Sequence, residues 1–192
     1  GNSPSKSLEE GGEGIIILNQ TPFYAESGGQ VGDIGIIKSD SYEFIVSDTY
    51  KFNGGIFGHT GHVRSGKINL KDKGNAIINI SHRSNIKRNH SATHLLHKAL
   101  KIVLGDHVEQ KGSLVDSVKT RFDFSHNKAL SSEEIKEIEL IVNSEILQNQ
   151  STQTRLMKIE EAQKEGATML FGEKYDEKVR VLNIGNSSEL CG

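Results

Sequence analysis

The hydrophobic and polar positions of the chain follow two different rhythms on the two sides of residue 81. Before that point, short apolar runs alternate with clusters of glycine, asparagine, aspartate and serine, a pattern typical of strands joined by tight turns. The runs fall at residues 15–18, 35–37, 42–46, 56–63 and 76–80. Residues 1–81 are therefore expected to form a β-rich, barrel-like module, with a poorly ordered start over residues 1–13.

A helical period begins after residue 82. Across residues 89–104 the apolar side chains form one broad face, and Gly105 follows as the residue that ends the helix. Ser131 and Glu134 carry the signature of a capping box before a second helix. The other expected elements are strands at 108–115, 119–124, 153–159 and 179–184, a helix at 135–146, and a short helix at 160–164 that ends at Gly166. Residues 82–192 thus predict an α+β module in which the first helix packs on an antiparallel sheet.

Composition narrows the class of protein. The balance of 34% hydrophobic and 25% charged residues is that of a soluble globular chain, and its 192 residues suffice for one large or two small domains. A single cysteine excludes an intrachain disulfide, and no secretory segment or membrane span is recognisable. We therefore expect a cytoplasmic protein with no membrane partner.

The net charge of −2 provides no global positive field for nucleic acid. Any RNA contact must then come from local basic stretches, such as residues 87–88 or 71–73. The alternative is that these are ordinary solvated surface charges.

Three histidines share one side of the first predicted helix. His90, His94 and His97 lie within about 60° of one another, away from the centre of the apolar face. Two histidines four residues apart can bind one metal ion, and imidazole suits zinc. Helical spacing of surface histidines is the alternative explanation, and His97 is expected to be a supporting or surface residue.

A glycine-rich segment is the second unusual feature, with four glycines among residues 28–35. It does not have the pattern of a dinucleotide or nucleoside-triphosphate loop. Two interpretations stay open. The segment either makes tight turns, or it offers a backbone surface, Ser27-Gly28-Gly29-Gln30, that a ligand or an RNA end approaches closely.

Six separated motifs resemble, in order, the editing region of alanyl-tRNA synthetase and its free-standing relatives, the AlaX-type trans-editing proteins. The similarity extends over about residues 14–192. The motifs are TPFYAESGGQVGDIG (21–35), RNHSATHLLHKAL (88–100), QKGSLV (110–115), RFDFSH (121–126), LFGEKY (170–175) and ELCG (189–192).

The resemblance implies a hydrolase that deacylates tRNA(Ala) wrongly charged with serine or glycine, the second half of a double sieve. It also implies zinc bound by an HxxxH motif, His90 and His94, and by a CxxxH motif that begins at Cys191. The histidine of the second motif would fall beyond residue 192, so the site is expected to be incomplete here. Thr93 and Gln110 match family residues beside the aminoacyl group.

The implied partners are the acceptor end of tRNA(Ala) and the remainder of the synthetase, whose ATP-dependent reaction needs another domain. A fragment of the synthetase, truncated at its C-terminus, is the preferred interpretation over a free-standing editor. Two alternatives remain: a tRNA acceptor-end binding module that is catalytically silent, because a metal ligand is missing, and a purely structural zinc domain. The sequence does not indicate an oligomeric state.

Overall fold

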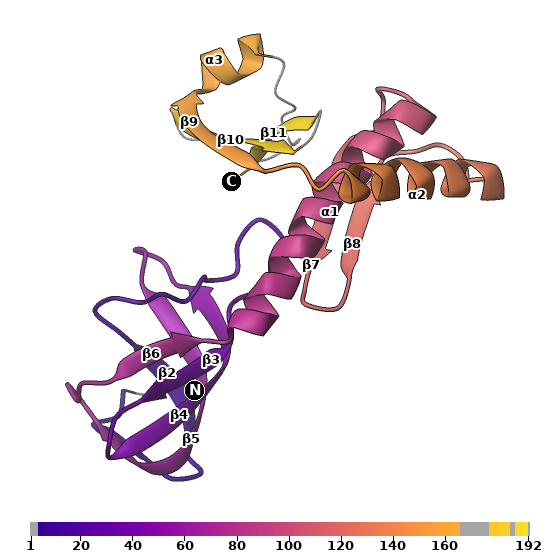
Figure 1. The fold of residues 1–192 in the computed structure, drawn as a ribbon. Coiled ribbons are helices and arrows are strands. Elements are labelled where there is room, and N and C mark those ends of the chain that lie inside the picture. The colour runs from indigo at the N-terminus through magenta and orange to yellow at the C-terminus, as the bar shows by residue number, and fades with distance from the viewer. Residues whose placement is uncertain (1–3, 166–176, 185–186, 192) are drawn as a thin grey trace. The chain divides into compact units, whose positions relative to one another are not determined.

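The computed structural model describes residues 4–165, 177–184 and 187–191 (Figure 1). It divides into two compact units, residues 1–86 and 87–192, and helix α1 (Ile80–Leu104) is shared between them. Because the helix continues through the division, a module boundary at residue 81 stays a prediction.

The first unit is an antiparallel sheet. Its strands are β1 (Ser7–Glu9), β2 (Glu13–Ile17), β3 (Gly35–Lys38), β4 (Tyr42–Lys51), β5 (Phe57–Asn69) and β6 (Asn75–Ile78). The strand order is β1-β5-β4-β3-β6, and β2 also pairs with the long strand β5. Strand β1 falls within the segment expected to be poorly ordered, so that expectation is wrong for residues 7–9.

The described strands of this sheet make an open path and not a closed ring. Strand β2 pairs with residues 58–62 of β5, and β1 pairs with residues 67–69, so both occupy the same edge of that strand. Strand β4 takes the other edge, and β6 ends the path beside β3. The predicted β-rich character of this unit is confirmed, but the barrel-like closure is not.

The core of this unit follows the twofold period of its strands. Along β4, Tyr42, Phe44 and Val46 are buried in alternation and pack with Phe23, Ile37 and Val63. A register shift between Val46 and Asp48 then changes the phase, so that Thr49 is the next fully buried side chain. This irregularity turns a polar residue of β4 inward.

Helix α1 begins nine residues earlier than its apolar pattern predicts. The side chain of Asn79 accepts a hydrogen bond from the backbone N–H of His82 at 3.0 Å, and its carbonyl accepts from Arg83 at 3.0 Å. Asn79 is therefore the N-cap. Residues 80–88 are mostly polar, with Ile86 buried, so they show little periodicity. The helix ends at Gly105, whose φ of 112° suits glycine.

In the second unit, the end of α1 packs with the hairpin β7 (Gln110–Val115)–β8 (Thr120–Phe124) and with α2 (Ser132–Leu147). The buried residues of this cluster are Ala99, Leu100, Val108 and Ile138. The capping box of α2 is confirmed, because the Ser131 hydroxyl accepts from the Glu134 N–H and the Glu134 carboxylate accepts from the Ser131 N–H. The latter bond lowers the pKa of Glu134, with Lys128 adding to the effect.

A second cluster of the same unit belongs to a three-stranded antiparallel sheet, in the order β11-β10-β9, and to the short helix α3. The bounds are β9 (Gln153–Lys158), α3 (Ile159–Lys164), β10 (Lys178–Ile184) and β11 (Ser187–Cys191). The predicted helix end at Gly166 and the motif at 170–175 lie outside the described residues. Within the described part of the chain, no helix combines the length and apolar character needed to span a membrane.

Candidate functional site

The glycine-rich segment of the first unit forms a tight hairpin turn. Ser27 and Gln30 exchange two backbone hydrogen bonds, at 3.1 and 3.0 Å. Between them Gly28 and Gly29 both have positive φ, 56° and 78°, as a two-residue turn of this kind requires. Ser27 and Gly28 are exposed, and a Cβ placed on Gly28 would meet nothing within 4 Å. The tight turn is thus present, while ligand binding by its exposed backbone stays a prediction.

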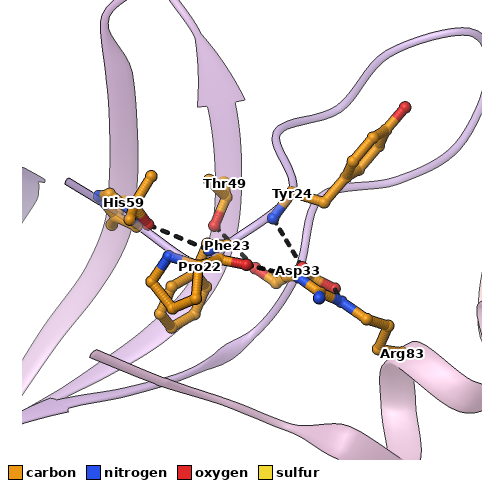
Figure 2. A network of polar contacts seen from close by, with 8 residues as sticks. Pro22, Phe23, Tyr24, Asp33, Thr49, His59 and Arg83 are labelled. Atoms are coloured by element: carbon orange, nitrogen blue, oxygen red, sulfur yellow. Dashed lines mark hydrogen bonds and ion pairs between the residues drawn. The ribbon is translucent and has the colours of Figure 1, made fainter. Parts of the chain in front are cut away.

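A buried carboxylate holds this turn against the start of α1 (Figure 2). Asp33, 1% exposed, accepts a hydrogen bond from the Tyr24 N–H at 2.7 Å. Arg83 donates to both oxygens of the same carboxylate, and its Nη2 also donates to the Pro22 carbonyl at 2.7 Å. The carboxylate is therefore engaged with a guanidinium and a backbone N–H, which suits a structural role better than proton transfer.

The register shift in β4 turns Thr49 inward, and Thr49 adds two hydrogen bonds to this network. The Thr49 hydroxyl donates to the Asp33 carbonyl at 2.8 Å, and the Thr49 carbonyl accepts from the Glu26 N–H at 2.9 Å. Gly32 lies so close that a Cβ there would be 2.1 Å from the Thr49 carbonyl oxygen. The glycine at position 32 is thus needed for close backbone approach, unlike the glycines of the exposed turn.

A buried histidine fixes the beginning of the segment. His59 Nδ1 lies 2.9 Å from the Ile16 carbonyl and Nε2 lies 2.7 Å from the Thr21 hydroxyl. Since a carbonyl can only accept, Nδ1 carries the proton of the neutral ring and Nε2 accepts from Thr21. Thr21 also accepts from the Phe23 N–H at 3.1 Å. Burial lowers the pKa of His59, and the Ile16 carbonyl offsets this only in part.

This lowered pKa predicts a pH-dependent stability. The unfolded chain binds the His59 proton more readily than the folded chain, so acid favours unfolding. We expect the His59 contribution to be fully present above about pH 6.5, the ordinary pKa of histidine, and to decline as the pH falls toward the folded-state value. Urea unfolding between pH 5 and 7.5 measures it. His59→Gln should flatten part of the dependence, and the exposed His62→Gln should not; equal slopes for all three proteins would contradict the prediction.

The histidine face of α1 belongs to the second unit and is more buried than the sequence suggests. His94 and His97 are 7% and 3% exposed, and His90 is half-buried. The His97 ring lies 5.2 Å from that of Phe122 on β8, so the interpretation of His97 as a surface residue is wrong. Leu95, Ala99 and Leu100 are buried as well. Between residues 93 and 100 of α1, most side chains are therefore buried, including those on the histidine side.

His90 and His94 lie side by side. Their rings are stacked, with centroids 5.1 Å apart and planes at 10°. Two imidazoles on successive turns of one helix provide the nitrogen donors that zinc prefers, so this pair fits a zinc site as two of its ligands. The backbone of Cys191 pairs with Arg180, but its side chain is outside the described residues. Among the described residues, no group of three or more potential ligands is assembled.

Thr93 is also buried, 7% exposed, and is linked to the β7–β8 hairpin. Its hydroxyl donates to the Asn89 carbonyl at 2.8 Å and lies 2.6 Å from the Thr120 hydroxyl. Gln110 is at the other end of the hairpin, opposite Phe124, and its amide donates to the Ser113 hydroxyl at 3.3 Å. The strand from 120 to 124 spans about 13 Å at its usual rise, so Thr93 and Gln110 are at separate levels. Their predicted roles remain predictions.

Sequence reasoning did not single out Asp33, Arg83, Thr49 or Thr120. Asp33 stands within the glycine-rich motif, and a carboxylate that is buried requires a cationic partner. That requirement is the signal that could have indicated a buried ion pair at Asp33. Nothing in the sequence designates Arg83 as that cation or Thr120 as the partner of Thr93, because each pair is joined only by the fold.

Part of the chain is similar to a known protein family. Residues 1–82 match the family described as tRNA synthetases class II (A). Nearly the whole chain is similar to curated alanine–tRNA ligases. That of Polynucleobacter asymbioticus is 55% identical over 99% of this chain and 22% of its own length. The ligases of Albidiferax ferrireducens and Dechloromonas aromatica are 56% and 58% identical over 100% and 96% of this chain, and 22% and 21% of their own lengths.

The predicted resemblance to alanyl-tRNA synthetase is therefore confirmed: over nearly its whole length, the chain is similar to a segment of alanine–tRNA ligases. The chain spans about a fifth of the length of these relatives (22%).

Proposed function

We propose that this chain is the part of an alanine–tRNA ligase that hydrolyses tRNA(Ala) wrongly esterified with serine or glycine. The observation that carries the proposal is the covered part of α1, where the rings of His90 and His94 are stacked and where Thr93 is 7% exposed. A hydroxyl and two potential metal ligands on successive turns of one helix suit a small polar aminoacyl group. The motifs around these residues, and the similarity to alanine–tRNA ligases, support this substrate class.

The reaction has a simple chemical requirement. Water must be oriented at the carbonyl carbon of the ester to the terminal ribose, and the oxyanion of the tetrahedral intermediate must be stabilised. The aminoacylation site of such a ligase cannot strongly exclude an amino acid that is smaller or similar in size. A second site with a polar group matched to serine removes the error without harming alanine, since alanine has no hydroxyl.

Zinc is the proposed cofactor, and His90 and His94 would hold it together with Cys191. When bound, zinc supplies positive charge that can lower the pKa of a coordinated water or hold the amino group of the substrate. The residues of the chain have separate proposed tasks: Thr93 accepts a hydrogen bond from the aminoacyl side chain, and Gln110 contributes polar contacts. The turn of Ser27, Gly28, Gly29 and Gln30 offers exposed backbone to the acceptor end of tRNA(Ala).

The proposal places the protein in the cytoplasm, acting with the remainder of the ligase. Its test is release of serine and glycine from Ser-tRNA(Ala) and Gly-tRNA(Ala) by the purified chain with added Zn²⁺, with Ala-tRNA(Ala) as the control substrate. Turnover of the first two well above the spontaneous rate supports the proposal. Acceptor-end binding without any turnover would replace it with the silent tRNA-binding module.

A further inference from the structure

The Thr93–Thr120 pair joins α1 to the first residue of β8. Their hydroxyl oxygens are 2.6 Å apart, Thr93 is 7% exposed and Thr120 is half-buried. Both residues belong to the second unit. The contact lies on the same helical face as the proposed aminoacyl site, so the direction of its hydrogen bond determines what Thr93 can offer to a ligand.

That direction follows from the single proton of each hydroxyl. Thr93 gives its proton to the Asn89 carbonyl, one turn earlier in α1, at 2.8 Å. The hydrogen bond between the two threonines must then be donated by Thr120 and accepted by Thr93. The hydroxyl protons of Thr93 and Thr120 are therefore both used in these hydrogen bonds, while the Thr93 oxygen has a second lone pair. The pair therefore presents an acceptor to any further group.

The surrounding contacts hold this arrangement in place. The Asn89 side chain donates to the Asp116 carbonyl at 2.8 Å. The Asp116 carboxylate accepts from the Val118 and Lys119 N–H groups at 2.7 and 2.8 Å, which closes the turn immediately before Thr120. A helical threonine has two χ1 choices, one of which bonds the carbonyl four residues earlier. Thr120 adds a second contact that favours this rotamer of Thr93.

We propose that Thr120 is a positioning residue that fixes the Thr93 hydroxyl as a hydrogen-bond acceptor, so that the site favours an aminoacyl group with a hydroxyl donor. This inference rests on the proposed editing function and specifies its selectivity. Serine supplies the donor through its side-chain hydroxyl. Glycine and alanine have no such group and therefore do not gain this hydrogen bond to Thr93.

The test compares Thr120→Val, which keeps the branched shape and removes the hydroxyl, with Thr120→Ser, which keeps the hydroxyl. Thr154→Val, on the exposed strand β9, is the matched control. For Thr120→Val we expect kcat/KM for Ser-tRNA(Ala) to fall about 5- to 10-fold, as for loss of one neutral hydrogen bond. The value for Gly-tRNA(Ala) should change less than about twofold, and Thr120→Ser should restore most of the serine activity. A parallel loss with both substrates would overturn the proposal and leave Thr120 a structural contact.

A binding measurement separates this inference from the editing proposal. Adenosine carrying a 3′-amide-linked seryl or glycyl group cannot be hydrolysed by an esterase, and calorimetry gives its affinity for the chain. The wild type should prefer the seryl compound and Thr120→Val should lose that preference, even if no deacylation occurs. Such a result would sustain the inference while the hydrolytic function fails. Equal affinities of the wild type for both compounds would refute the acceptor role.

Discussion

Replacing Asp33 with alanine is expected to lower the free energy of unfolding by about 3–5 kcal/mol, the usual loss when one partner of a buried ion pair is removed. Asp33 is 1% exposed and accepts from Arg83 and from the Tyr24 N–H. Without the carboxylate, a guanidinium that is 30% exposed and a backbone N–H would lose their acceptor. The glycine-rich turn would also lose its attachment to the start of α1.

Urea unfolding followed by far-ultraviolet circular dichroism measures this change. Asp33→Asn keeps the shape and one acceptor oxygen, so it should lose less than Asp33→Ala. The matched control is Glu9→Ala, which removes an exposed ion pair with Lys67 at 2.9 Å, where both side chains are at least half exposed. Such a surface pair contributes about 0–1 kcal/mol. Similar losses for Asp33→Ala and Glu9→Ala would mean that the Asp33 network does not support the fold.

The Asp33 network also supports the backbone of the glycine-rich segment from beneath, and its own polar groups are used in hydrogen bonds. The Asp33 carboxylate accepts hydrogen bonds from Arg83 and from the Tyr24 N–H, and the Asp33 carbonyl accepts from Thr49. Gly32 permits the close approach of this backbone to Thr49. The exposed part is the backbone of the turn at Ser27 and Gly28. Rigid support beneath an exposed backbone lowers the ordering cost of binding, which is the physical reason to keep this turn as the proposed RNA contact.

Local patterns predicted most of the elements. The runs at 42–46 and 56–63 became β4 and β5, and the Ser131–Glu134 signature became a capping box, because alternation and capping are properties of neighbouring residues. The start of α1 was missed for the same reason, since its cap at Asn79 precedes a polar stretch. Strand β1 has three residues and exists through its pairing with β5, which no local pattern indicates.

The candidate site was predictable in its residue types and not in its contacts. Helical spacing placed His90, His94 and His97 on one side of the helix. It did not predict that His97 packs on Phe122, because the facing strand β8 begins 23 residues later, at Thr120. Similarly, Arg83 finds Asp33 across 50 positions of the sequence. Long-range polar partners depend on which surfaces meet in the fold, and periodicity carries no information about that.

Replacing His94 with alanine is expected to reduce kcat/KM for Ser-tRNA(Ala) by about 100-fold or more. Changes to groups that merely support a metal ligand cost about 10–100-fold, and loss of a ligand should cost at least as much. The stacked geometry of His90 and His94 makes them the first two proposed ligands, so His90→Ala should have a similar effect. Deacylation is measured under single-turnover conditions, and bound zinc is measured by elemental analysis of the same samples.

The difficulty is that His94 is 7% exposed, so its loss can lower stability as well as activity. Leu95→Ala is the matched control, since Leu95 is buried on the same helix, 4% exposed, but is not a proposed ligand. It should alter the melting temperature while keeping bound zinc and most of the deacylation rate. If His90→Ala and His94→Ala instead unfold the protein, zinc is structural. If they stay folded within about threefold of wild-type activity, far less than a lost ligand should cost, the pair has no part in the reaction.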